Sequence, residues 1–72
     1  MLNTYYKKLS KEEKEFAIYR IASKTDYEEA IVRKVLHRYN PLMEIKENRV
    51  VINRYSYHKL VREIHQENQS SK

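Results

Sequence analysis

The sequence contains no cysteine, no glycine and no tryptophan, and it has only one proline and one phenylalanine. A chain without cysteine forms neither disulfides nor thiolate metal sites, and this absence is typical of a reducing compartment. A chain without glycine has no glycine-rich loop of the kind that cradles phosphates. These absences favour a cytoplasmic protein and count against a nucleotide-binding loop.

Long hydrophobic runs are also missing. No apolar stretch approaches the roughly 18 residues that a membrane span needs. Residues 1–8 lack the apolar core of a signal peptide. We therefore expect a soluble intracellular protein that has no membrane partner.

No group of residues is spaced like a catalytic or metal site. His37, His58 and His65 are too scattered for a metal signature, and no acid, histidine and nucleophile set is typical of an active site. A chain of 72 residues also has little room for a buried pocket. We therefore expect no enzyme activity, no metal and no cofactor.

The 72 residues are enough for a single small domain, residues 1–72, of which residues 1–8 and 67–72 are predicted to be flexible tails. One core of this size buries only about 60% of the surface of the unfolded chain, so its stability is marginal. Association into a homodimer would enlarge the core and stays open as an alternative.

Two amphipathic helices are predicted before Pro41. Ser10 and Glu13 form a capping box, which predicts a helix from about Lys11 to Lys24. Asp26 with Glu29 repeats the cap signature and predicts a second helix. That helix must end near Asn40, because the residue before a proline is biased away from helical geometry. Apolar residues at helical spacing predict the core: Ile18, Ile21, Val32, Val35 and Leu36.

After Pro41 the pattern is that of a hairpin followed by a helix. Residues 42–46 alternate in polarity, residues 49–53 are rich in β-branched side chains, and Glu47 and Asn48 lie at the expected turn. Ser56 can cap a third helix that runs to about Gln66. The predicted fold is therefore mainly α with a small β-hairpin, in the order α-α-β-β-α.

The corner between the first two helices resembles the helix-turn-helix of DNA-binding proteins. The resemblance lies in apolar Ile21, small Ala22, the turn at residues 25–27, and Val32 and Val35 on the inner side of the second helix. Asp26 departs from the family pattern, because it stands where the turn usually carries a glycine able to take a positive φ, a conformation that aspartate reaches less easily than glycine but more readily than a branched residue. With the hairpin as a wing, the whole resembles a compact winged-helix domain.

The same stretch is similar to the helical half of HU-type nucleoid proteins. Their glycine-rich arm, which enters the minor groove, has no counterpart in a chain without glycine. Both resemblances imply a DNA-binding protein.

The charge balance favours a polyanionic partner. The formal net charge is +5, and basic residues crowd the second helix and the last third of the chain. If the second helix enters a groove and the hairpin touches phosphates, the contacts are expected to be Arg33, Lys34, His37, Arg38, Arg49, Arg54 and Lys59. Against this, Glu28 and Glu29 lie at the end of the helix that usually enters the major groove, where acids repel phosphates.

Seven tyrosines are unusual in so short a chain. With a single phenylalanine available, some of them must serve as core aromatics, and Tyr19, Tyr27 and Tyr39 are expected there. Tyrosine also suits interfaces, because it offers a large apolar body and a hydroxyl at low entropic cost. The tyrosines expected to face a partner are Tyr5, Tyr6, Tyr55 and Tyr57.

Two functions stay open. The first is a small non-enzymatic protein that binds nucleic acid, duplex DNA above all, and regulates transcription. The alternative is a protein-binding module, or a virus-encoded inhibitor, that docks on an acidic surface of a host or partner protein. Convergence of the basic residues on one face would favour the first, whereas a ring of charge around the molecule would mean that the charge serves solubility.

Overall fold

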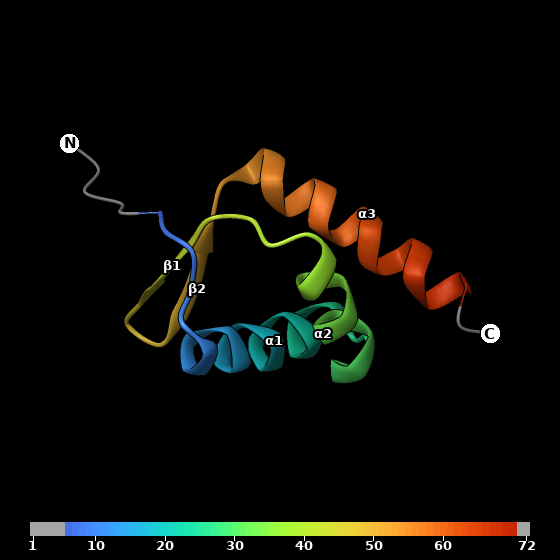
Figure 1. Cartoon of the computed structure of the whole chain (residues 1–72), viewed down its shortest axis with the longest axis horizontal. Helices are drawn as coiled ribbons and strands as arrows, with labels where there is room; N and C mark the ends of the chain where they lie inside the picture. Colours follow the sequence, from blue (N-terminus) through green and yellow to red (C-terminus); the bar gives the residue numbers. More distant parts are fainter. Residues whose placement is uncertain (1–5, 71–72) are drawn as a thin grey trace.

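The computed structural model describes residues 6–70. Three helices and one antiparallel hairpin follow in the order α-α-β-β-α, which confirms the predicted fold class. The elements are α1 (Lys11–Thr25), α2 (Glu29–Arg38), β1 (Met43–Lys46), β2 (Arg49–Ile52) and α3 (Arg54–Ser70). Figure 1 shows α1 and α3 on opposite sides of the molecule, with the hairpin towards one end and α2 towards the other. Positions 1–5 and 71–72 of the predicted tails lie outside the described residues.

The start of α1 is the capping box that the sequence predicts. The Ser10 Oγ accepts a hydrogen bond from the Glu13 amide at 3.3 Å, and the Ser10 amide donates to the Glu13 carboxylate at 3.0 Å. Two first-turn donors that the helix itself leaves unpaired are thereby satisfied.

The corner between α1 and α2 is made by a left-handed residue. Asp26 has φ 64°, the conformation that a glycine usually takes in such a turn, and it ends α1. The expectation that Asp26 also caps α2 is wrong, because the N-cap residue is Glu28, which makes no side-chain capping bond. At the other end of α2, Tyr39 is already extended, so the helix ends before Asn40, the residue that Pro41 biases away from helical geometry.

The hairpin has the predicted two-residue turn. Lys46 pairs with Arg49, and both turn residues, Glu47 and Asn48, have positive φ, as a type I′ turn requires. Lys7 adds a short bridge to Met43 on the other edge of β1, through two backbone hydrogen bonds of 2.9 and 3.0 Å. One edge of the small sheet is thus partly covered, whereas β2 faces α1.

Helix α3 is longer than its sequence pattern suggests. Asn53 caps it by accepting from the Tyr55 amide at 2.9 Å, so the helix begins at Arg54 and Ser56 is not its cap. The helix continues to Ser70, past the predicted end near Gln66. Glu67 explains the extension, because it is buried against α2 instead of lying in a polar tail.

The core lies where the helices and the hairpin meet. The predicted residues Ile18, Ile21, Val32, Val35 and Leu36 are all buried, together with Met43, Leu60 and Ile64 from the second half of the chain. Tyr27 and Tyr39 pack against this core as predicted. Tyr19 does not, since it is 56% exposed. Its neighbours Ala17, Ile18 and Ile21 fill the inner side of α1, which leaves Tyr19 on the outer side.

Candidate nucleic-acid interface

The outward side of α2 carries the basic residues that the helix-turn-helix resemblance implies as DNA contacts, but carboxylates already hold them. The Arg33 guanidinium binds Glu15 of α1 through both Nη2 and Nε, at 2.6 and 3.4 Å. This paired geometry is the strong form of the arginine–carboxylate contact, and it lowers the pKa of Glu15. Arg33 therefore offers little free charge to a phosphate.

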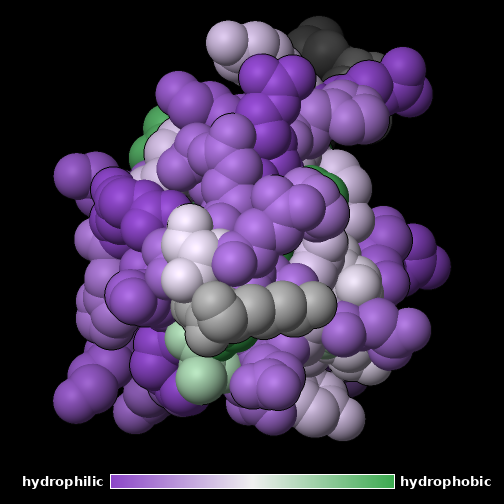
Figure 2. All heavy atoms as spheres, turned by 90° about the vertical axis from the view of Figure 1, so that its right-hand side faces the viewer, coloured by the Kyte–Doolittle hydropathy of each residue, from purple (hydrophilic) through white to green (hydrophobic). Residues whose placement is uncertain are grey.

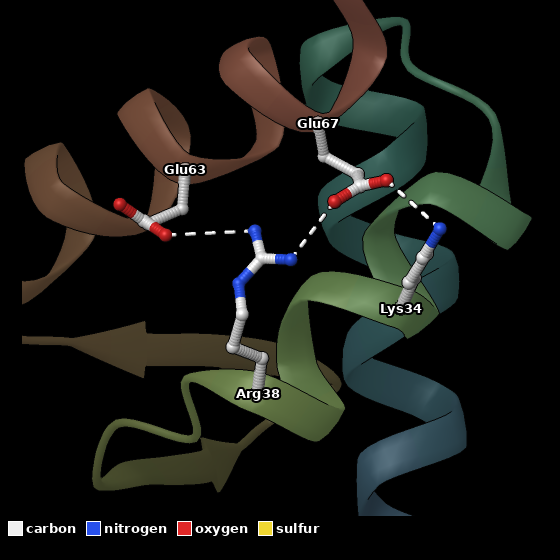
Figure 3. Close-up of polar contacts among 4 residues, drawn as sticks. All are labelled: Lys34, Arg38, Glu63 and Glu67. Atoms are coloured by element: carbon white, nitrogen blue, oxygen red, sulfur yellow. Dashed lines mark hydrogen bonds and ion pairs between the residues drawn. The ribbon is translucent and has the colours of Figure 1, made fainter. Parts of the chain in front are cut away.

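Lys34 and Arg38 are held in the same way by α3 (Figure 3). Glu67 receives the Lys34 ammonium at 3.1 Å and the Arg38 guanidinium at 2.8 Å, and Glu63 lies 3.5 Å from Arg38. The group contains two cations and two anions, so its net charge is zero. A phosphate approaching α2 would have to displace carboxylates that also repel it.

This cluster makes stability depend on pH. The hydrogen bond from Arg38, followed by that from Lys34, holds the pKa of Glu67 below its usual range. In the unfolded chain Glu67 regains its ordinary pKa, so the unfolded state binds the proton first as the pH falls. The stabilisation is complete above about pH 5 and is lost as the pH drops through the lowered pKa.

We expect Glu67→Gln to lower the melting temperature at pH 7 and to flatten its fall between about pH 5 and pH 3. Thermal melts followed by circular dichroism over this range check the expectation. Glu47→Gln, at an exposed carboxylate in the hairpin turn outside the cluster, serves as the control and should change the slope less than Glu67→Gln does. Identical acid profiles for wild type and Glu67→Gln would show that the cluster does not stabilise the fold.

A different set of cations gathers on the other side of the molecule. Two adjoining hollows share Lys24, Arg49 and Tyr57, and they run from the C-terminal half of α1 across β2 to the first turns of α3. The larger has a volume of about 520 Å³. We call this feature the basic groove and define it by Arg20, Lys24, Arg49, Arg54, Tyr57 and His58.

The basic groove is electrostatically one-sided. Four permanent cations line it, no carboxylate lines it, and none of these four is ion-paired within residues 6–70. The Lys24 ammonium lies 5.2 Å from the centre of the Tyr57 ring, so a cation and an aromatic face are held together in the groove. Half-buried Val50 and Ile52 add apolar surface.

Acidic residues gather at another place, the corner between α1 and α2. The hollow there is lined by Tyr19, Ser23, Asp26, Tyr27, Glu28 and Glu29 among others. Figure 2 looks onto the end of the molecule that lies on the right in Figure 1, and the visible surface is hydrophilic over most of its area. Acids thus line the corner hollow, and four cations without a carboxylate line the groove, while other exposed cations, Lys8, Lys11 and Lys46 among them, lie outside both.

The predicted contacts divide between these surfaces. Arg49 and Arg54 lie in the basic groove, whereas Arg33, Lys34 and Arg38 are paired on α2, where His37 is exposed. The Lys59 ammonium lies 5.0 Å from the centre of the Tyr39 ring.

Two groove residues, Arg20 and Lys24, are absent from the predicted contacts. They are one helical turn apart on α1, and this spacing is a signal that sequence reasoning could have used. Strand β2 packs against α1, and this packing places Arg20 and Lys24 near Arg49. The sequence alone does not reveal which side of α1 faces β2.

The tyrosines expected to face a partner also divide. Tyr55 is 73% exposed and Tyr6 is 40% exposed, whereas Tyr57 is half-buried in the groove. Tyr5 lies outside the described residues.

Comparison with protein-family models, with curated proteins and with solved structures finds no match to this chain. Within residues 6–70, no helix has both the length and the apolar character needed to cross a bilayer. The same residues contain no cluster of histidine or acidic side chains placed to hold a metal ion.

Proposed function

We propose that this protein is a non-enzymatic nucleic-acid-binding protein that holds the phosphate backbone in the basic groove. The observation that carries the proposal is the convergence of Arg20, Lys24 and Arg49 with Arg54 along two adjoining hollows that no carboxylate lines. Cations elsewhere on the surface can serve solubility. Four cations brought together raise the local concentration of a polyanion and gain free energy from the release of its counterions.

The chemistry of the groove suits phosphates. Guanidinium groups bind phosphate oxygens through paired hydrogen bonds, and three of the four permanent cations are arginines. They come from a helix, a strand and a second helix start, so their spacing is fixed by packed elements. In this proposal the hairpin contacts nucleic acid as the wing of a winged-helix protein does. Helix α2 does not serve as the recognition helix, because its cations are paired and its first turn is acidic.

We expect Arg20→Gln with Arg49→Gln to weaken oligonucleotide binding at least tenfold at low salt. Two fewer phosphate contacts should also reduce the slope of log K against log salt by about two. Fluorescence anisotropy of labelled duplex and single-stranded oligonucleotides between about 50 and 200 mM salt measures both quantities.

The matched control is Lys8→Gln with Lys11→Gln, which removes the same charge from two exposed residues that do not line the groove. This variant should keep both the affinity and the salt slope close to those of wild type. If wild type binds neither oligonucleotide at low salt, or if the two double variants lose affinity equally, the proposal is wrong.

Exposed apolar side chains favour a second candidate, the protein-binding module. Tyr19 and Leu42 are 56% and 50% exposed, and neither lines the basic groove. A protein-binding module that docks on an acidic partner surface would keep its partner after nuclease treatment. Regulation of transcription and formation of a homodimer stay predictions.

A further inference from the structure

Tyr55 is the most exposed of the large hydrophobic side chains in residues 6–70, with 73% of its surface accessible. It lies in the first turn of α3, directly after Arg54. Among the described residues no other ring and no cation stacks on its face, whereas Tyr57 and Tyr39 each lie below a lysine ammonium. The ring therefore projects from α3 into solvent, and no ring or cation of the described residues covers its face.

Two permanent cations share a hollow with this ring. Tyr55 lines it with Lys59 and Arg62, together with His58 and one acid, Glu63. The acid, Glu63, is the carboxylate that approaches Arg38 of α2. The surroundings of Tyr55 are thus positive on balance.

The hollow beside Tyr55 adjoins the basic groove at His58, which lines both, and Arg54 in the groove precedes Tyr55 in the chain. A strand whose phosphates follow Arg49 and Arg54 would therefore carry its next bases to the open face of Tyr55. An open aromatic ring beside a cationic track is the arrangement used for stacking on unpaired bases.

We propose that the ligand of the basic groove is single-stranded nucleic acid, with a base stacked on Tyr55 and the backbone held by Arg49 and Arg54. This inference rests on the proposed function and adds the class of nucleic acid. Bases inside a duplex are already stacked and cannot reach such a ring without being flipped out. Helix α2, which the duplex-binding hypothesis needs in a major groove, has its cations paired with Glu15, Glu63 and Glu67.

The test compares wild type, Tyr55→Ala and Tyr55→Phe on oligo-dT and oligo-U of about 12 nucleotides, a duplex of the same length and an abasic strand. We expect wild type to bind the single strands at least tenfold more tightly than the duplex. The affinity of Tyr55→Ala for the single strands should be about tenfold lower than that of wild type. Its affinity for the abasic strand should be unchanged, because the substitution removes only base stacking. Tyr55→Phe should bind like wild type, since it keeps the ring. The oligo-dT and oligo-U arms distinguish DNA from RNA as the preferred source of the strand.

Tyr19→Ala is the control, because Tyr19 is another exposed tyrosine but lies in the acidic corner hollow. It should not change binding. Equal affinity for duplex and single strands, or a Tyr55→Ala variant that binds oligo-dT like wild type, would overturn this inference. Arg20→Gln with Arg49→Gln would still weaken binding in that case, so the proposed function would stand. If polyglutamate competes as well as oligo-dT does, the groove is a surface for acidic proteins and both proposals fall.

Discussion

Leu36→Ala is expected to destabilise the fold more than any surface substitution. Leu36 is fully buried on α2, where the helix packs against both α1 and α3. Removing a buried leucine side chain and leaving a cavity costs about 3 kcal/mol. A domain of this size has roughly 4–11 kcal/mol of total stability. The melting temperature should therefore fall by roughly 12–24 °C, as measured by circular dichroism.

Leu42→Ala is the matched control, because it deletes the same atoms from a leucine that is 50% exposed. Its free energy of unfolding should change by only about 0.5 kcal/mol. If both variants melt at the same temperature, Leu36 does not lie in the core described above.

Local patterns were enough to predict the fold class and most of the core. The Ser10 capping box, the helical spacing of Val32 and Leu36, and the turn at Glu47 and Asn48 are each decided by residues close together in the chain. Interactions of this kind can be recognised without knowing what packs against them.

Contacts between distant residues account for the errors. The extension of α3 to Ser70 accompanies the contacts of Glu67 with Lys34 and Arg38, and no local pattern announces them. Tyr19 has the spacing of a core residue, yet smaller neighbours fill the inner side of α1. Polar appearance alone made residues 67–70 look like a tail.

The candidate interface could be predicted only in part. Net charge and the basic hairpin indicated Arg49 and Arg54, which do line the groove. Whether a cation is free or paired depends on its three-dimensional neighbours, so the charge on α2 was overestimated. Arg20 and Lys24 were not predicted, because they join the groove only through the packing of β2 on α1, which is a contact between distant parts of the chain.

Charge reversal in the basic groove is the substitution with the largest expected effect on binding. Arg20→Glu with Arg49→Glu removes two of the four permanent cations and adds two anions, so the charges in the groove cancel. The affinity for single-stranded oligonucleotide should fall by about 100-fold or more, because phosphate contacts are lost and repulsion is added. Both residues are exposed, so the melting temperature should stay within a few degrees of wild type.

The most direct test of the proposed interface is the dissociation constant of one oligo-dT, measured for three variants at about 0.15 M salt, where distant exposed charges are screened. The variants are the groove reversal, Lys8→Glu with Lys11→Glu as its charge-matched control, and Arg33→Gln with Lys34→Gln on α2. We predict a loss of about 100-fold for the groove reversal and less than about fivefold for the other two. A loss on α2 as large as that in the groove, or equal losses for the two reversals, would contradict the proposal that the basic groove binds nucleic acid.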